Sequence, residues 1–203
     1  NQIFIHEPNW HAYKRTPNIS ISLNMRGWLL DRGSLTQRLI KLSRGNFRVK
    51  VLKQNISTPA LSETRALKIP LRQKALIRQV FLYCHNEPLV YARSVIPLRT
   101  LTGRLRYLQN LQNKALGALL FKDATMKRGI IDIGSTKINP HSRHKFVTTN
   151  DLEIWGRRSL FYIDKKPLLV SEQFMPALQN IIEHEWYSNG ILGSRSVDEP
   201  RRS

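Results

Sequence analysis

The pattern of hydrophobic and polar positions along the chain predicts a sheet made of hairpins. Runs rich in β-branched and aromatic residues alternate with a period of two and are separated by short polar stretches that contain Asn, Asp or Pro. Such runs are typical of antiparallel strand pairs. The first hairpin is expected to turn at 85–88 and the last at 164–167. The predicted strands span 46–51, 76–84, 89–96, 125–133, 158–163 and 168–174.

Two stretches predict helices beside this sheet. Ser34 and Gln37 form a capping-box pattern ahead of an apolar run, so a helix is expected to begin at Leu35 with its first backbone amides free. Apolar positions near one face predict a second helix over 104–122. The remaining stretches are polar connections at 54–67 and 135–150, and a tail after residue 177 with a short amphipathic piece and a frayed end.

These elements predict an α+β fold with an antiparallel sheet and helices packed at one side. Connections between neighbouring strands dominate, and the helices are few and segregated. At 203 residues, the chain is long enough for one full-sized core and too short for two, so a single domain is expected.

Charge adds a preference for anionic partners. The chain carries 33 Lys and Arg against 14 Asp and Glu, a net charge of +19. Nucleic acid, an acidic membrane surface or a small anion are therefore the partners to consider. The basic residues are spread out and no nucleic-acid-binding motif is present, so a solvated basic surface is the commoner interpretation and specific nucleic-acid binding is not expected.

Few residues suggest a metal, redox or membrane role. Cys84 is the only cysteine, which excludes an internal disulfide and a multi-cysteine zinc site. His141 and His144 lie in a polar stretch without a carboxylate at ligand spacing, so neither a metal nor a cofactor is predicted. No signal peptide or membrane-spanning run is found, so a cytoplasmic protein is expected, with peripheral contact to acidic membranes left open.

Three charged residues fall on apolar strand faces. Side chains alternate across a strand, so Glu172 shares a face with Val170 and Phe174, and Arg78 shares one with its own apolar neighbours. Arg93 likewise falls on an apolar face. Burying an ionised group costs several kcal/mol unless it is paired. Two interpretations have about even weight, a buried Arg–Glu pair that fixes strands and a site for a small hydroxylated acid.

Free amides at a helix start offer a further contact for an anion. The amide of Leu35 is such a group, although capping by Ser34 and water is the commoner arrangement. Leu116 has an equally ordinary interpretation as helix core.

An ordered set of motifs from about 28 to 177 resembles one family, chorismate lyase. The most specific is Trp155-Gly156-Arg157-Arg158-Ser159, followed by Lys166-Pro167-Leu168-Leu169, Glu172 and Phe174-Met175-Pro176-Ala177. Earlier matches are Gly33-Ser34-Leu35-Thr36-Gln37-Arg38, Asn86-Glu87-Pro88, Ala92-Arg93-Ser94-Val95-Ile96-Pro97, Leu116-Gly117 and Ile131-Asp132-Ile133-Gly134. Arg157 and Arg158 are adjacent and point to opposite faces of a strand, and neither is assigned a role.

The resemblance implies a sheet of about six strands with helices over an internal ligand cavity. It implies conversion of chorismate to 4-hydroxybenzoate and pyruvate for ubiquinone synthesis, without a cofactor and by a monomer. It places Arg78, Glu172 and main-chain groups of Leu35 and Leu116 at the ligand, with Arg93 nearby. The family-like domain is expected to span 1–177, with a partly disordered extension at 178–203.

Two other functions remain open. Effector domains of some transcription regulators share this architecture and bind a small acid without reacting with it. They usually accompany a DNA-binding module, for which the 27 residues before Trp28 are too few. A basic protein associated with nucleic acid is the third possibility, which salt-dependent DNA binding would support.

Overall fold

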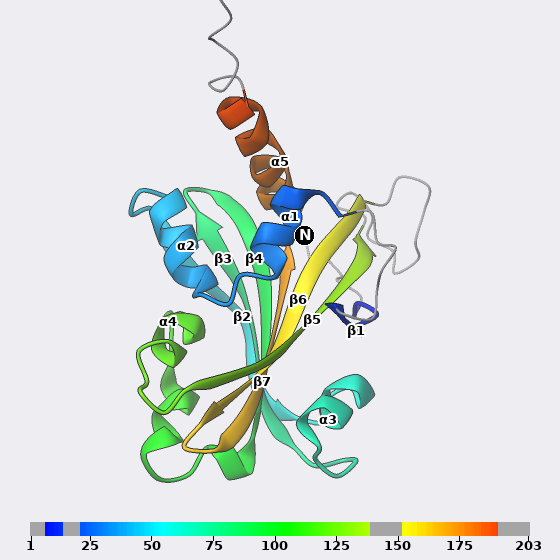
Figure 1. Cartoon of the computed structure of the whole chain (residues 1–203). Coiled ribbons are helices and arrows are strands. Elements are labelled where there is room, and N and C mark those ends of the chain that lie inside the picture. The colour runs from blue at the N-terminus through cyan, green and yellow to red at the C-terminus, as the bar shows by residue number, and fades with distance from the viewer. Residues whose placement is uncertain (1–6, 14–20, 139–151, 191–203) are drawn as a thin grey trace, which may run out of the picture.

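The protein is a seven-stranded antiparallel sheet with helices on both faces (Figure 1). The computed structural model describes residues 7–13, 21–138 and 152–190. The strand order is β1-β5-β6-β7-β4-β3-β2. The strands are β1 (His11–Ala12), β2 (Phe47–Ser57), β3 (Ala75–Cys84), β4 (Glu87–Pro97), β5 (Lys127–Ile138), β6 (Leu152–Ile163) and β7 (Lys166–Phe174). The predicted α+β class is confirmed, and β1 is the added seventh strand.

Both predicted hairpins are present, with tighter turns than expected. β3 and β4 are joined at His85 and Asn86, while β6 and β7 are joined at Asp164 and Lys165. The last two residues have φ of 49° and 63°, the left-handed conformation of a two-residue hairpin turn. Because that turn has two residues rather than four, β7 already begins at Lys166.

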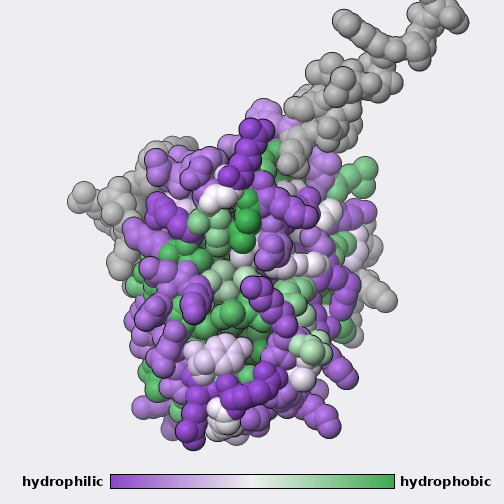
Figure 2. All heavy atoms as spheres, turned by 90° about the vertical axis from the view of Figure 1, so that its left-hand side faces the viewer, coloured by the Kyte–Doolittle hydropathy of each residue, from purple (hydrophilic) through white to green (hydrophobic). Residues whose placement is uncertain are grey.

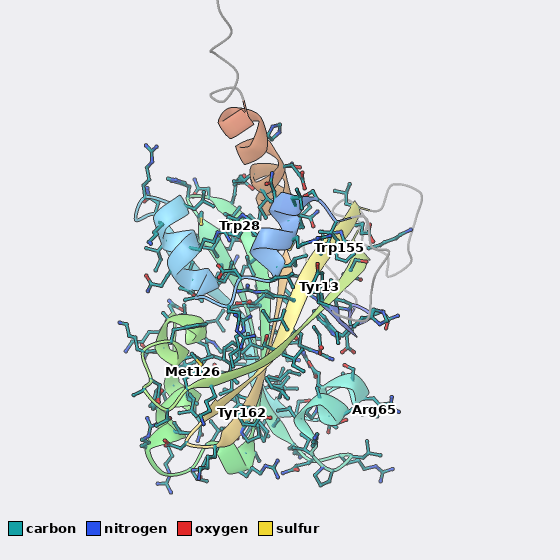
Figure 3. The ribbon with its side chains drawn as sticks, viewed as in Figure 1. Tyr13, Trp28, Arg65, Met126, Trp155 and Tyr162 are labelled. Atoms are coloured by element: carbon teal, nitrogen blue, oxygen red, sulfur yellow. The ribbon has the colours of Figure 1, made fainter. Side chains whose placement is uncertain are left out.

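The helices α1 (Leu23–Leu29), α2 (Leu35–Leu42) and α4 (Leu116–Leu120) cover one face of the sheet, which we call the helix face (Figure 1). The helix α3 (Leu61–Leu67) covers the opposite face. The helix α2 begins at Leu35 as predicted, because the Ser34 side chain accepts a hydrogen bond from the Gln37 amide. Trp28, labelled in Figure 3, is buried. Its ring lies 6.4 Å from that of Phe174 and under the guanidinium of Arg38.

Two predictions outside the hairpins are wrong. The single helix expected over 104–122 is replaced by a 3-10 helix, η3 (Gly103–Asn110), and then by α4, and a short 3-10 turn, η2 (Leu98–Thr100), precedes them. The buried Leu105, Leu108 and Leu111 recur every three residues, which is the period of a 3-10 helix. The expected connection at 54–67 contains the end of β2 and α3, whose Glu63 carboxylate accepts from the Ala60 amide.

The last helix, α5 (Pro176–Gly190), continues the core beyond the predicted domain boundary. Leu178 and Ile182 are fully buried in the apolar cluster that also holds Trp28 and Phe174. Residues 191–203 of the expected extension lie outside the described residues. So does most of the expected loop at 135–150, of which β5 takes the part up to Ile138. No described helix is long and apolar enough to cross a bilayer.

Two apolar clusters lie on the helix face and leave a polar band between them. One cluster surrounds Trp28, Leu35 and Phe174, and the other surrounds Leu105, Leu116 and Leu168. In the surface view of the side that carries α2 and α4, apolar side chains show between hydrophilic ones (Figure 2). The polar band holds the residues of the candidate site.

Candidate active site

Glu172 pairs with Arg157 across the β6–β7 hairpin. The two residues are direct partners in the register, so their side chains leave the same face of the sheet. Arg157 donates from Nε to Oε2 of Glu172 at 2.6 Å, and Arg157 is 2% exposed. The other carboxylate oxygen, Oε1, receives no hydrogen bond from the described residues. The Glu172 side chain is therefore fixed at one oxygen and available at the other.

Arg157 and Arg128 both hold the segment that leads into α2. Arg157 Nη1 donates to the carbonyls of Trp28 at 3.1 Å and Asp31 at 2.7 Å. Arg128 Nη1 donates to the carbonyls of Asp31 at 3.1 Å and Gly33 at 3.4 Å, and Arg128 Nε donates to the Ser159 hydroxyl at 3.1 Å. The start of α2 is thus tied to the strands that carry Glu172.

Arg78 is buried on β3 and holds the segment that leads into α4. Its Nη1 donates to Oε1 of Gln54 at 2.7 Å. Its Nη2 donates to the carbonyls of Gln112 at 2.6 Å and Lys114 at 3.2 Å. Burial lowers the pKa of this guanidinium, because its charged form has lost water. Arg78 does not contact Glu172, so the buried pair considered from the sequence exists with Arg157 instead.

The first turns of α2 and α4 meet over the sheet. Leu35 and Leu116 are the first residues of these helices and are buried, and the geometry of a helix leaves their amides without an intrahelical acceptor. Thr36 packs directly on Gly117, where an added Cβ would lie 2.9 Å from the Thr36 Oγ1. The structure therefore brings the two predicted main-chain contacts to one place, beside the segment that Arg78 holds.

Small side chains lie on the sheet between Arg78 and Glu172. The strand β4 separates β3 from β7, and its Ala92 and Ser94 face the same side as these two charged residues. In an ideal sheet the two Cα atoms, two strands and two residues apart, would be about 12 Å from each other. The long side chains of Arg78 and Glu172 can thus reach towards each other above the small side chains of Ala92 and Ser94.

The site has more positive than negative charge. Arg78, Arg128 and Arg157 face one paired carboxylate, that of Glu172. Burial, with the nearby charge of Arg157, lowers the pKa of Arg128 to about 10. Each guanidinium is held mainly by neutral carbonyl, amide or hydroxyl groups, which leaves charge that an anion would balance.

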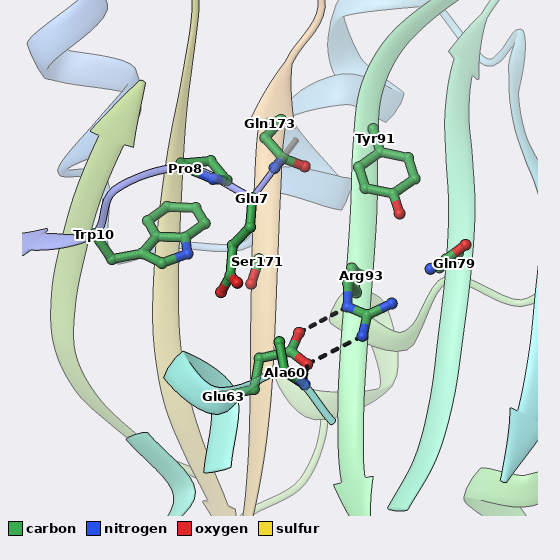
Figure 4. A pocket seen from close by; sticks show the side chains of 10 residues that line it. All are labelled: Glu7, Pro8, Trp10, Ala60, Glu63, Gln79, Tyr91, Arg93, Ser171 and Gln173. Carbon is green, nitrogen blue, oxygen red and sulfur yellow. Dashed lines mark hydrogen bonds and ion pairs between the residues drawn. The ribbon is translucent and has the colours of Figure 1, made fainter. Parts of the chain in front are cut away.

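Arg93, which was expected near the ligand, is not part of this group. It pairs in the register with Gln79 and Ser171, one residue out of step with Arg78 and Glu172, and so it points to the opposite face. There Arg93 forms a bidentate pair with Glu63, at 2.7 and 3.0 Å (Figure 4).

The sequence interpretation missed the roles of Arg157 and Arg128. A turn over 164–167 would place Ser159 opposite Glu172, whereas the two-residue turn at Asp164 and Lys165 places Arg157 there. Recognising that turn would have identified the pair. Arg128 lies beside a register shift between Arg128 and Ile131, so no strand pattern predicts its direction.

A metal centre is not seen in the described part of the chain, where no group of three or more His, Cys, Asp or Glu is arranged to hold an ion. The two histidines considered from the sequence, His141 and His144, lie outside the described residues. The buried thiol of Cys84 donates to the Leu39 carbonyl at 3.5 Å, and burial raises the pKa of this thiol, as suits a core residue.

Comparison with known proteins decides the family. The family model described as chorismate lyase matches residues 8–183. The chain belongs to the chorismate lyase family. A "Probable chorismate pyruvate-lyase" of Psychromonas ingrahamii is 40% identical over 162 residues, which cover 77% of this chain and 84% of that relative. A protein of the same name from Nitrosomonas europaea is 33% identical, over 85% of this chain and 96% of its own length.

The fold of this chorismate lyase family member is similar to that of an effector domain. The effector domain of PhnF from Mycobacterium smegmatis superimposes with a TM-score of 0.52 at 13% identity, over 73% of this chain and 91% of that one. At this identity the likeness concerns the fold alone.

Proposed function

We propose that this protein is a chorismate-pyruvate lyase that converts chorismate to 4-hydroxybenzoate and pyruvate. The observation that carries the proposal is the half-free carboxylate of Glu172, which lies across the small residues Ala92 and Ser94 from the buried cation Arg78. The arrangement suits a small acid with a hydroxyl at its other end. Membership of the chorismate lyase family supports the choice of substrate.

In the proposed complex, Arg78 and the amides of Leu35 and Leu116 hold the ring carboxylate. A charged hydrogen bond and two helix-start amides are suited to a carboxylate. Oε1 of Glu172 accepts a hydrogen bond from the ring hydroxyl. The side-chain carboxylate of chorismate would meet the positive charge of Arg128.

The reaction needs orientation more than a strong nucleophile. The ether C–O bond breaks, the hydrogen on the hydroxyl-bearing ring carbon leaves, and the ring becomes aromatic. In a concerted reaction this hydrogen moves to the enolpyruvyl methylene, which gives pyruvate directly and requires only a folded, desolvated substrate. In a stepwise reaction Glu172 takes the proton and the released enolpyruvate picks up a proton on its methylene. Arg157 acts in both cases as a positioning residue, because it fixes Oε2 of Glu172.

The experiment that tests the proposal is incubation of the purified protein with chorismate. We expect 4-hydroxybenzoate and pyruvate in equal amounts, measured by chromatography and by a coupled pyruvate assay. Tight binding of 4-hydroxybenzoate is also expected, because the contacts proposed for the substrate ring remain in the product.

The competing function is that of a non-catalytic domain that binds a small acid. We consider this function because the fold is similar to that of an effector domain. Such a domain would bind chorismate or 4-hydroxybenzoate in calorimetry and yet form no pyruvate over hours. The same incubation therefore separates the two functions.

The setting of the activity is part of the proposal. We propose a cytoplasmic monomer that supplies the aromatic ring for ubiquinone. Gene deletion should then lower ubiquinone in the source organism, and added 4-hydroxybenzoate should restore it. Gel filtration tests the monomer, and sedimentation with acidic vesicles tests whether the net charge of +19 leads to membrane contact.

A further inference from the structure

A second polar cavity lies on the face of the sheet opposite the candidate active site. It has a volume of about 230 Å³ and lies between β3, β4, β7, the N-terminal segment and the start of α3 (Figure 4). Side chains of Gln79, Tyr91, Ser171 and Gln173 line it. None of these takes part in the proposed lyase reaction, since register places them on the other face from Arg78 and Glu172.

An ion pair forms one wall of this cavity and is already satisfied. Arg93 donates from Nε and Nη2 to the two carboxylate oxygens of Glu63, and the Ala60 amide donates to the same carboxylate at 2.8 Å. Glu63 is 3% exposed. The pair therefore offers little attraction to a charged ligand.

Two buried polar atoms at this face have no hydrogen-bond partner. Oε1 of Gln173 is an unpaired acceptor and Nε of Arg158 is an unpaired donor. Gln173 lines the cavity and is 4% exposed, while Arg158 pairs in the register with Ser171, which also lines it. A buried polar atom without a partner costs about 1–3 kcal/mol. A ligand hydroxyl in the cavity would donate the hydrogen bond that Oε1 of Gln173 lacks.

The charges around the cavity oppose an ionic ligand. Arg93 and Glu63 are paired at one wall, Glu7 also lines the cavity, and Arg158 lies just beyond, 5.1 Å from the ring of Trp10. An anion would meet two carboxylates, and a cation would meet two guanidinium groups. The other lining groups are amides and hydroxyls, which both donate and accept. Burial raises the pKa of Tyr91, so its hydroxyl stays neutral.

We propose that this cavity binds a small uncharged polyhydroxylated molecule of sugar or polyol type. Ligand hydroxyls donate to Oε1 of Gln173 and exchange hydrogen bonds with Ser171, Tyr91 and Gln79, while the rings of Trp10 and Tyr91 flank the ligand (Figure 4). The proposal is independent of the lyase reaction, because the two sites lie on opposite faces of the sheet.

The test is ligand-observed NMR on the full chain with three matched probes. D-glucose is the neutral probe, D-glucose 6-phosphate the anionic one and D-glucosamine the cationic one. We expect a saturable saturation-transfer signal that is strongest for glucose and is not displaced by 4-hydroxybenzoate. Gln173→Leu should weaken glucose binding about threefold to tenfold, as should Tyr91→Phe, since each removes a hydrogen bond.

Tyr83→Phe is the matched control, because Tyr83 lies on the same face but stacks with Arg48 and does not line the cavity. It should leave glucose binding unchanged, and all three variants should retain the wild-type rate with chorismate. If Gln173→Leu fails to fold, Tyr91→Phe alone tests the proposal, since Tyr91 is only half-buried and its substitution should leave the fold intact. No saturable glucose signal would mean that the cavity holds water only and would overturn the proposal. Stronger binding of either charged probe, or no effect of Tyr91→Phe, would overturn it as well.

Discussion

Arg157 and Glu172 form a buried ion pair in which only one carboxylate oxygen is used, at 2.6 Å from the guanidinium. The same guanidinium also binds the carbonyls of Trp28 and Asp31, so one side chain links β6, β7 and the approach to α2. The pair fixes strands and at the same time prepares Glu172 for a ligand. Glu172 can therefore belong both to an Arg–Glu pair that fixes strands and to a site for a small hydroxylated acid, the two interpretations that the sequence left open.

Replacing Arg157 should damage activity through Glu172. Arg157→Lys keeps the charge but loses the planar fork, so we expect kcat to fall at least tenfold with a smaller change in KM. Arg157→Ala leaves Glu172 unpaired and should lower the free energy of unfolding by about 3–5 kcal/mol, measured with urea. Arg48→Lys is the control, because Arg48 is exposed and stacks on Tyr83. Equal kinetics for the two lysine variants would contradict the positioning role.

Removing the buried cation at Arg78 should weaken ligand binding. Arg78→Met keeps the length of the side chain but removes its charge and its hydrogen bonds to Gln54, Gln112 and Lys114. We expect affinity for 4-hydroxybenzoate to fall about 10- to 100-fold, the loss of a charged hydrogen bond. Calorimetry measures this. Unchanged affinity in a folded Arg78→Met protein would exclude Arg78 from the site.

The contact between α2 and α4 should depend on Gly117. Gly117→Ala places a Cβ 2.9 Å from the Thr36 Oγ1, so we expect a loss of about 1–3 kcal/mol in unfolding free energy and weaker product binding. Gly27→Ala in α1 is the control: nothing lies within 4 Å of its Cβ, and helix propensity predicts a gain of about 0.5–1 kcal/mol. Thr36→Ala should rescue the Gly117→Ala variant. If the two glycine variants have the same stability, the close approach of the helices is not what Gly117 provides.

The excess positive charge should make the site select anions. 4-Hydroxybenzoate at 100 times its Kd should raise the free energy of unfolding by about 2.7 kcal/mol. The neutral analogue 4-hydroxybenzamide at the same concentration should give a much smaller thermal shift, since Arg78 then faces no carboxylate. Equal shifts for the two compounds would show that charge does not govern binding.

The sequence predicted which side chains of one strand share a face, but not which face of the sheet that is. Alternation put Glu172 and Arg78 on apolar faces, and the structure places both on the helix face. Alternation within one strand does not say which face of the sheet is meant, and so it could not show that Arg93 lies on the face opposite to Arg78 and Glu172. The register of β4 against β3 and β7 decides this, and it depends on turn length and on the shift between Leu82 and Tyr83.

The helices were predicted where a local signal exists. Ser34 caps α2 through its own side chain, and a serine just before an apolar helical pattern can be recognised in the sequence. The 3-10 helix η3 was missed because the leucine spacing of three also fits one side of an α-helix. Arg157 was missed because its partner Glu172 is fixed by a turn of left-handed residues, Asp164 and Lys165, that are not glycine.

The most direct test of the central claim compares kcat/KM for chorismate in the wild-type protein and in Glu172→Gln. The glutamine keeps the shape of Glu172 and an oxygen that accepts from Arg157, while it loses the charge that holds the ring hydroxyl. We predict that the wild-type protein releases 4-hydroxybenzoate and pyruvate in equal amounts and that Glu172→Gln lowers kcat/KM about 10²- to 10⁴-fold. A wild-type protein that forms no pyruvate, or a Glu172→Gln protein as fast as wild type, would contradict the account.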